Sequence, residues 1–175
     1  RIPDDYRSAL PPAPKSVKIE LTANCDFKCF YCATGSRLRD KGEIDWDFYC
    51  RIVQEMRDAG VEELGVFYLG ESFLYKKLPE AIDFAKNVAG YPYVFLTSNG
   101  RMASPERVGA CIEAGLDSLK FSFNYADPEQ CIDITRVDAF DTVVANIQAV
   151  KAIRDEVEAR TGHHCGIYAS SIHYD

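Results

Sequence analysis

Three cysteines within eight residues are the part of this sequence whose residue types could do chemistry. Cys25, Cys29 and Cys32 stand four and then three residues apart, and the first of them comes shortly after the apolar stretch 17–21. Cysteine thiolates are the ligands of iron–sulfur clusters, and a short loop can direct several of them at one cluster. A closed structural site needs four protein ligands, but the next cysteine, Cys50, falls in a helical pattern. Three local ligands would leave one metal corner open for a substrate.

The spacing Cys25-x3-Cys29-x2-Cys32, with the aromatic Tyr31 before the last cysteine, resembles the signature of the radical S-adenosylmethionine (SAM) superfamily. In that family the cysteines hold a [4Fe–4S] cluster, and the amino and carboxylate groups of SAM bind its open iron. The resemblance implies reductive cleavage of SAM to a 5′-deoxyadenosyl radical that abstracts a hydrogen atom from an organic or peptide substrate. It also implies an electron donor such as flavodoxin or ferredoxin, and contact between Tyr31 and the adenine of SAM.

Other interpretations of the cysteine loop stay open. A structural zinc knuckle would need a fourth ligand from a distant position, and the cysteines of this cysteine-rich chain could also be clustered by accident. An iron–sulfur or zinc module with a structural or electron-transfer role is the alternative to an enzyme. A dinucleotide-dependent enzyme is excluded, because no glycine-rich turn follows the first predicted strand.

Composition and charge restrict the class of protein. The 175 residues are 47% hydrophobic and 27% charged, which is enough for one domain with a sizeable core. The net charge of −7 argues against nucleic acid as a partner, and no apolar run reaches the length of a membrane span. Seven cysteines without a secretory signal favour thiols in a reducing, cytoplasmic compartment. We expect the cysteines outside the loop to be small buried hydrophobic residues: Cys50, Cys111, Cys131 and Cys165.

Strand and helix patterns alternate along the chain. Strands are predicted at 17–22, 64–69, 93–97, 118–123 and 165–173. Helices are predicted at 46–59 with Asp45 as the N-cap, at 76–89, from Ser104-Pro105 to Gly115, and at 139–160, with an irregular connection at 124–137. This alternation predicts a parallel sheet and is compatible with a doubly wound fold or a barrel.

The family resemblance decides between these two folds. It implies an α/β fold, a partial (β/α)6 TIM-type barrel with parallel strands, of which this chain supplies about five. Residues 1–16 contain four prolines and are expected to be an irregular lead-in. Residues 17–175 would form the partial-barrel domain, truncated at its C-terminal end. The arrangement is also similar to family members with a C-terminal extension carrying auxiliary clusters, which would lie beyond Asp175.

Polar residues follow the second strand, where the active site of such a barrel lies. Gly70 and Glu71 resemble part of the family's Gly-Gly-Glu-Pro motif, from which Leu69 and Ser72 depart. The resemblance implies that Glu71 accepts a hydrogen bond from the SAM amino group, and Gly70 would let the backbone approach the ligand. A solvated glutamate after a turn is the alternative.

The later strand ends supply further candidate cofactor-binding residues. Ser122 and Asn124 would lie on one face of the fourth strand, and in the family residues there bind the ribose or carboxylate of SAM; an ordinary strand-to-turn transition is the alternative. Ser98 and Asn99, at the end of the third strand, could line the same cavity. Arg136 resembles a family arginine that pairs with the SAM carboxylate, although a surface arginine fits equally well. The sequence names no catalytic residue.

Overall fold

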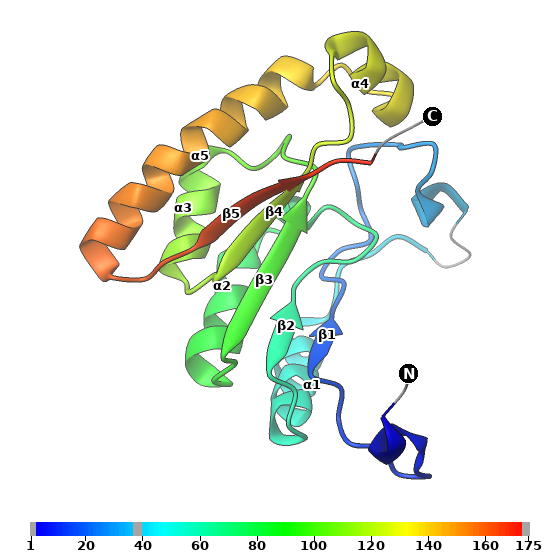
Figure 1. Ribbon diagram of the computed structural model, residues 1–175, viewed down its shortest axis with the longest axis vertical. Coiled ribbons are helices and arrows are strands. Elements are labelled where there is room, and N and C mark those ends of the chain that lie inside the picture. Colours follow the sequence, from blue (N-terminus) through cyan, green and yellow to red (C-terminus); the bar gives the residue numbers. More distant parts are fainter. Residues whose placement is uncertain (1–2, 37–39, 173–175) are drawn as a thin grey trace.

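The computed structural model describes residues 3–36 and 40–172 and places five parallel strands in one sheet (Figure 1). The strands are β1 (Ser16–Lys18), β2 (Glu63–Gly65), β3 (Tyr93–Ser98), β4 (Ser118–Ser122) and β5 (Gly166–Ser170). They pair in the order β1-β2-β3-β4-β5, the order in which they occur along the chain. A doubly wound sheet reverses its strand order, whereas a barrel does not. The predicted α/β partial barrel with about five parallel strands is therefore confirmed.

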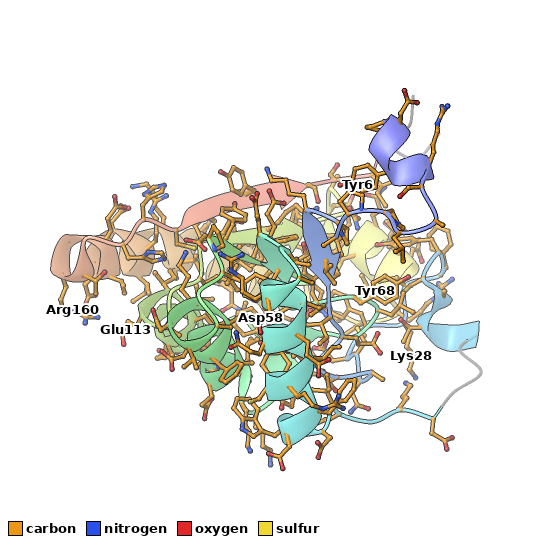
Figure 2. The ribbon with its side chains drawn as sticks, turned by 90° about the horizontal axis from the view of Figure 1, so that it is seen from below. Tyr6, Lys28, Asp58, Tyr68, Glu113 and Arg160 are labelled. Carbon is orange, nitrogen blue, oxygen red and sulfur yellow. The ribbon has the colours of Figure 1, made fainter. Side chains whose placement is uncertain are left out.

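Helices cover one face of this sheet, as Figure 2 shows for α1, α3 and α5. The helices are α1 (Trp46–Asp58), α2 (Leu78–Asp83), α3 (Pro105–Glu113), α4 (Pro128–Thr135) and α5 (Phe140–Thr161). A π-helical turn, η4 (Phe84–Val88), continues α2, and single 3-10 turns occupy Asp4–Arg7 (η1), Ala33–Ser36 (η2) and Ser72–Leu74 (η3). Among the described residues, no helix is long and apolar enough to cross a membrane.

The core lies between the sheet and these helices. Alternate residues of the central strands point toward the helices and are fully buried, among them Leu96, Leu119 and Phe121. The facing helix residues Tyr49 and Val53 of α1 are buried equally well. Each such side chain contributes about 1.5–3 kcal/mol by leaving water, so this layer fixes the strands whose ends carry the site.

β1 and β2 are shorter than the predicted strands 17–22 and 64–69. The Ile19 N–H still donates to the Gly65 carbonyl of β2, and after it the chain leaves that strand: the Ala23 N–H donates to the Gly42 carbonyl, and the Ile44 N–H donates to the Leu21 carbonyl. The segment after β2 is likewise held by a side chain, because the Leu69 N–H donates to Glu20 Oε2 at 3.0 Å. The Val66 N–H still donates to the Phe95 carbonyl of β3 at 3.0 Å, but beyond this bond the segment leaves the sheet, and both segments form the loops of the site.

The predicted helix 76–89 begins two residues later and changes its period at Phe84. The Ala89 N–H donates to the carbonyl of Phe84 at 2.8 Å, five residues back, which defines the π turn. The wider turn brings Ala85 and Ala89 to the core side and leaves Val88 63% exposed.

The connection 124–137, predicted to be irregular, contains helix α4. Asp127 is its N-cap, accepting a hydrogen bond from the Gln130 N–H at 2.8 Å, and Pro128 occupies the first turn. Cys131 and Ile134 bury its inner face. The prediction of an irregular connection was therefore wrong for residues 128–135, where Asp127 and Pro128 start a helix.

The other helix starts and the scattered cysteines largely follow the predictions. Asp45 caps α1 by accepting from the Phe48 N–H at 2.9 Å, but Ser104 accepts no such bond at the start of α3. A hydrogen bond with Ser104 instead lowers the pKa of Glu106.

Three of the four scattered cysteines are buried, whereas Cys50 is half-buried. β5 ends at Ser170, and the predicted continuation to His173 lies partly outside the described residues.

The N-cap of α4 gives a test of this helix. Asp127→Ala should lower the free energy of unfolding by about 1 kcal/mol, because the Gln130 N–H loses its acceptor. Asp133→Ala, an exposed site within the same helix, is the matched control and should be neutral or slightly stabilising. Equal unfolding free energies for the two variants in urea titrations would contradict the capping role.

Candidate metal centre

The three loop cysteines lie around one cavity at the carboxyl end of the sheet. The cavity has a volume of about 230 Å³, and its walls are Cys25, Phe27, Lys28, Cys29, Cys32, Thr34 and Lys41. In Figure 2, Lys28 of this loop and Tyr68 of the loop after β2 lie toward the same end of the molecule, opposite Glu113 and Arg160. The structure therefore brings together the three cysteines that the sequence singled out.

The donor set fits a multi-atom cluster better than a single ion. Within residues 3–36 and 40–172, no three Cys, His, Asp or Glu side chains converge closely enough to hold one metal ion. A tetrahedral zinc site needs all its sulfur ligands about 2.3 Å from one point. Three thiols spread around a cavity suit a cuboidal cluster, whose iron atoms occupy separate corners. The cations Lys28 and Lys41 on the same wall would offset the negative charge of such a cluster.

Burial controls the protonation of these thiols. It raises the pKa of Cys25 to about 12, and the nearby carboxylates of Glu71 and Asp26 add to the rise. Burial also raises the pKa of Cys29, while a hydrogen bond with Tyr31 opposes it. Both side chains are therefore neutral thiols without metal at neutral pH, and ligation must release their protons.

Helix α4 holds the cysteine loop on both sides of Cys29. The Lys28 N–H donates to the Thr135 carbonyl at 2.9 Å, and the Phe30 N–H donates to the Ile134 carbonyl at 3.1 Å. These acceptors belong to the last turn of α4, where helix carbonyls have no partner within the helix. The helix that the sequence did not reveal is thus one of the supports of the loop.

Asp26 ties the loop to the end of β3. Its Oδ1 accepts from Asn99 Nδ2 at 2.8 Å, and its Oδ2 lies 3.3 Å from Arg101 Nη1 in an ion pair. Asn99 Nδ2 also lies 3.9 Å from Cys25 Sγ. Asn99 was predicted to contact the cofactor, and its side chain here positions the first cysteine. Asp26 and Arg101 were missed, because their partners lie more than seventy residues away along the chain.

Glu71 is buried at the centre of these strand ends. Its Oε1 accepts from Phe73 N–H at 3.1 Å and Ser98 Oγ–H at 2.8 Å, and its Oε2 accepts from Asn99 N–H at 2.8 Å. The Glu71 N–H in turn donates to the Asn24 carbonyl at 2.8 Å. Burial nevertheless raises the pKa of Glu71 to about 7, although these three donors lower it.

Gly70 makes the contact between the first two loops possible. A Cβ at Gly70 would lie 1.8 Å from the Thr22 carbonyl oxygen and 2.9 Å from that of Asn24. Thr34 adds a polar link between the same loops, because its hydroxyl donates to the Leu69 carbonyl at 2.9 Å and lies 2.9 Å from Cys32 Sγ. The Thr22 and Asn24 carbonyls therefore occupy the space that a side chain at residue 70 would need.

The predicted residues on the β4 side form a second group. Asn124 Nδ2 donates to the Tyr31 hydroxyl at 2.7 Å, and its Oδ1 accepts from the Ile172 N–H at 3.1 Å. Tyr31 keeps 43% of its surface exposed. Ser122 is half-buried at the end of β4. Arg136 is exposed at the C-cap of α4, with a left-handed φ of 63°.

Replacing the glycine should disrupt the first two loops. Gly70→Ala should lower the free energy of unfolding by about 1–3 kcal/mol, the usual penalty for overpacking, because backbone must move to admit the methyl group. Gly42→Ala is the matched control, since a Cβ there meets no atom within 4 Å. Similar denaturation curves for both variants would show that the close approach at Gly70 is not required.

The raised pKa of Glu71 gives a pH dependence. Between its ordinary value of 4.5 and about 7 the folded chain binds a proton that the unfolded chain has released. The associated stability is complete below pH 4.5 and is lost as pH rises through 7. From pH 4.5 to 7.5 the unfolding free energy of the wild type, relative to Glu71→Gln, should therefore fall by about 2–3 kcal/mol. A difference that stays constant in urea titrations across this range would contradict the raised pKa.

Known proteins share both the sequence pattern and the fold. The sequence matches the radical SAM superfamily over residues 19–167. A GTP 3′,8-cyclase of Chlorobaculum tepidum is 30% identical over 127 residues, 73% of this chain and 38% of that protein. GTP 3′,8-cyclase 2 of Mycobacterium bovis is 32% identical over 143 residues, 78% of this chain and 38% of that protein. This chain therefore spans well under half the length of these two relatives.

Solved structures extend the likeness to the fold. SuiB of Streptococcus suis bound to S-adenosylmethionine has a TM-score of 0.68 and 19% identity, covering 90% of this chain and 34% of SuiB. BtrN in complex with AdoMet and 2-DOIA has a TM-score of 0.64 and 15% identity, covering 89% of this chain and 56% of BtrN. The family match covers most of the strands and all three cysteines, and the chain belongs to the radical SAM superfamily.

Proposed function

We propose that this chain is the SAM-cleaving domain of a radical SAM enzyme, with a [4Fe–4S] cluster held by Cys25, Cys29 and Cys32. The observation that carries the proposal is the single cavity that these three thiols line. The cluster, when bound, supplies the electron that cleaves SAM to methionine and a 5′-deoxyadenosyl radical. The protein's own part is to hold three thiolates in place, orient SAM and exclude water.

Glu71 is proposed to receive the ammonium group of SAM. Three of the roughly four lone-pair positions of its carboxylate are occupied, and Oε2 accepts from the Asn99 N–H alone. An ammonium group beside this buried carboxylate would favour its ionised form. In this proposal Gly70 and Ser98 position the carboxylate, and neither needs to touch the ligand.

The residues on the β4 side are proposed to receive the rest of SAM. The half-exposed ring of Tyr31, held by Asn124 at its hydroxyl, offers a surface for the adenine. Ser122 lies on the sheet face opposite the helices and would meet the ribose. Arg136 is exposed beside the loop anchor at Thr135 and would pair with the carboxylate of SAM.

The substrate is proposed to be an organic molecule or a peptide. GTP 3′,8-cyclases are among the relatives, and one solved structure similar in fold contains a bound peptide. A flavodoxin or ferredoxin would deliver the electron, in a cytoplasmic compartment where thiols stay reduced. With a net charge of −7, neither nucleic acid nor a membrane surface is proposed as a partner.

Cluster loading and SAM cleavage test this proposal on the full-length protein. Anaerobic reconstitution should give about four irons and four sulfides per chain at this site, and Cys25→Ala, Cys29→Ala or Cys32→Ala should each abolish loading. Cys50→Ala, on α1, is the control and should load normally. Reduced protein with SAM should then release methionine and 5′-deoxyadenosine.

Two results would contradict the proposal. Tightly bound zinc without sulfide would identify a structural metal site. A reducible cluster that binds SAM but releases no 5′-deoxyadenosine, with or without candidate substrates, would identify a binding or electron-transfer module.

A further inference from the structure

A ring of polar groups joins the end of β3 to the residue after the first cysteine. Asn99 Nδ2 donates to Asp26 Oδ1 at 2.8 Å, and Asn99 Oδ1 accepts from the Arg101 N–H at 2.9 Å. The Arg101 guanidinium completes the ring, because its Nη1 lies 3.3 Å from Asp26 Oδ2. Both oxygens of the Asp26 carboxylate are therefore engaged, one by an amide and one by a cation.

The turn that carries Arg101 is held by helix α5. Asn146 Nδ2 donates to the carbonyls of Gly100 and Arg101 at 2.9 Å and 3.1 Å. Gly100 has a left-handed φ of 86°, and a Cβ there would lie 2.9 Å from Val143 Cγ1 of the same helix. The backbone of Arg101 is therefore fixed between β3 and α5, and its guanidinium reaches the cysteine loop from this fixed turn.

The Asp26 carboxylate lies beside the first cysteine. It follows Cys25 directly in the sequence, and the amide that binds it, Asn99 Nδ2, also lies 3.9 Å from Cys25 Sγ. The side chain of Asp26 is 12% exposed and that of Arg101 39%. Partly buried charges are screened less by water and salt than charges on the open surface, so both act on groups near Cys25.

Arg101 has a role that the other nearby cations do not share. In the described part of the chain it is the one cation in an ion pair with Asp26. Lys28 and Lys41 line the wall of the cysteine cavity, but neither pairs with this carboxylate within the same described residues. Without Arg101, Asp26 would be a partly buried anion with no counter-charge.

An unpaired carboxylate in this position would oppose reduction of a cluster. Reduction adds an electron to a group that is already anionic, and net charge is among the factors that set cluster potentials. We propose, on the basis of the cluster assigned above, that Arg101 offsets the charge of Asp26 beside Cys25 and so makes the cluster easier to reduce. Arg101 is thus a positioning residue, which acts through Asp26 without touching the cluster or SAM.

The midpoint potential of the cluster tests the inference in reconstituted full-length protein. Arg101→Gln removes the cation and should move the potential to more negative values, with the iron and sulfide content of the wild type. We expect a three- to tenfold change in the one-electron equilibrium constant, or about 30–60 mV at 59 mV per decade. Asp26→Asn removes the anion instead and should move the potential in the opposite direction.

Two further variants are controls. Arg101→Lys keeps the positive charge and should stay close to the wild-type potential. Lys86→Gln breaks another partly buried ion pair, formed with Asp117 at 2.8 Å. Because Asp117 directly precedes β4, this pair lies at the amino end of the sheet, away from the cysteine loop, and its loss should leave the potential unchanged.

The cluster-free protein supplies an independent measurement of the ion pair. Arg101→Gln and Asp26→Asn should each unfold at a lower urea concentration than the wild type, because each leaves a partner unpaired. Their effects should not add, since the two side chains contact each other. The double variant should therefore unfold close to the less stable single variant.

The outcomes separate this inference from the proposed function. A wild type without iron and sulfide would overturn the proposed function, and this inference with it. A normal cluster whose potential is unchanged in Arg101→Gln, or shifts in the same direction in Arg101→Gln and Asp26→Asn, would overturn this inference alone. Failure of Arg101→Gln to load a cluster, or additive losses of stability, would also overturn it, because Arg101 would then be a structural group or would not be paired with Asp26.

Discussion

The loops of this site depend on one buried carboxylate. An ionised group is expensive to bury unless several donors surround it, and Glu71 meets this condition with donors from η3 and from the end of β3. Its own amide binds Asn24, one residue before the first cysteine. Glu71 therefore links three strand ends, through its carboxylate and its backbone amide, and Gly70 is needed because any larger residue would separate the first two.

The cysteine loop has little secondary structure of its own and takes its shape from its neighbours. The last turn of α4 accepts the amides on both sides of Cys29, and Asp26 binds the end of β3. A parallel sheet makes this possible, because the carboxyl ends of all its strands meet at one edge. Preorganisation matters here, since the buried thiols must lose protons on ligation, and burial opposes that loss.

The sequence predicted the strand-and-helix alternation, the cysteine triad and the position of Glu71, because each has a local signal. It did not predict what Glu71 binds, nor the loop anchors at Asp26 and Thr135, because these contacts join segments far apart in sequence. Helix α4 is a different case. Its start, Asp127-Pro128, is a local capping signal, so this helix, unlike the long-range contacts, could have been predicted from the sequence.

The predicted cofactor-binding residues differ in whether contacts within the protein already occupy them. Ser98 and Gly70 are used within the protein, one bonded to Glu71 and the other packed against the Thr22 carbonyl. Tyr31 and Arg136 keep exposed surface on the β4 side. A ligand can gain affinity only from groups that it can reach, so in the proposed function the first pair would act on a cofactor indirectly, through the shape of the loops. Substitutions of Ser98 or Gly70 would therefore alter protein stability and cofactor affinity together, and so would those of Tyr31, whose hydroxyl is bonded to Asn124, whereas substitution of the exposed Arg136 side chain can alter affinity alone.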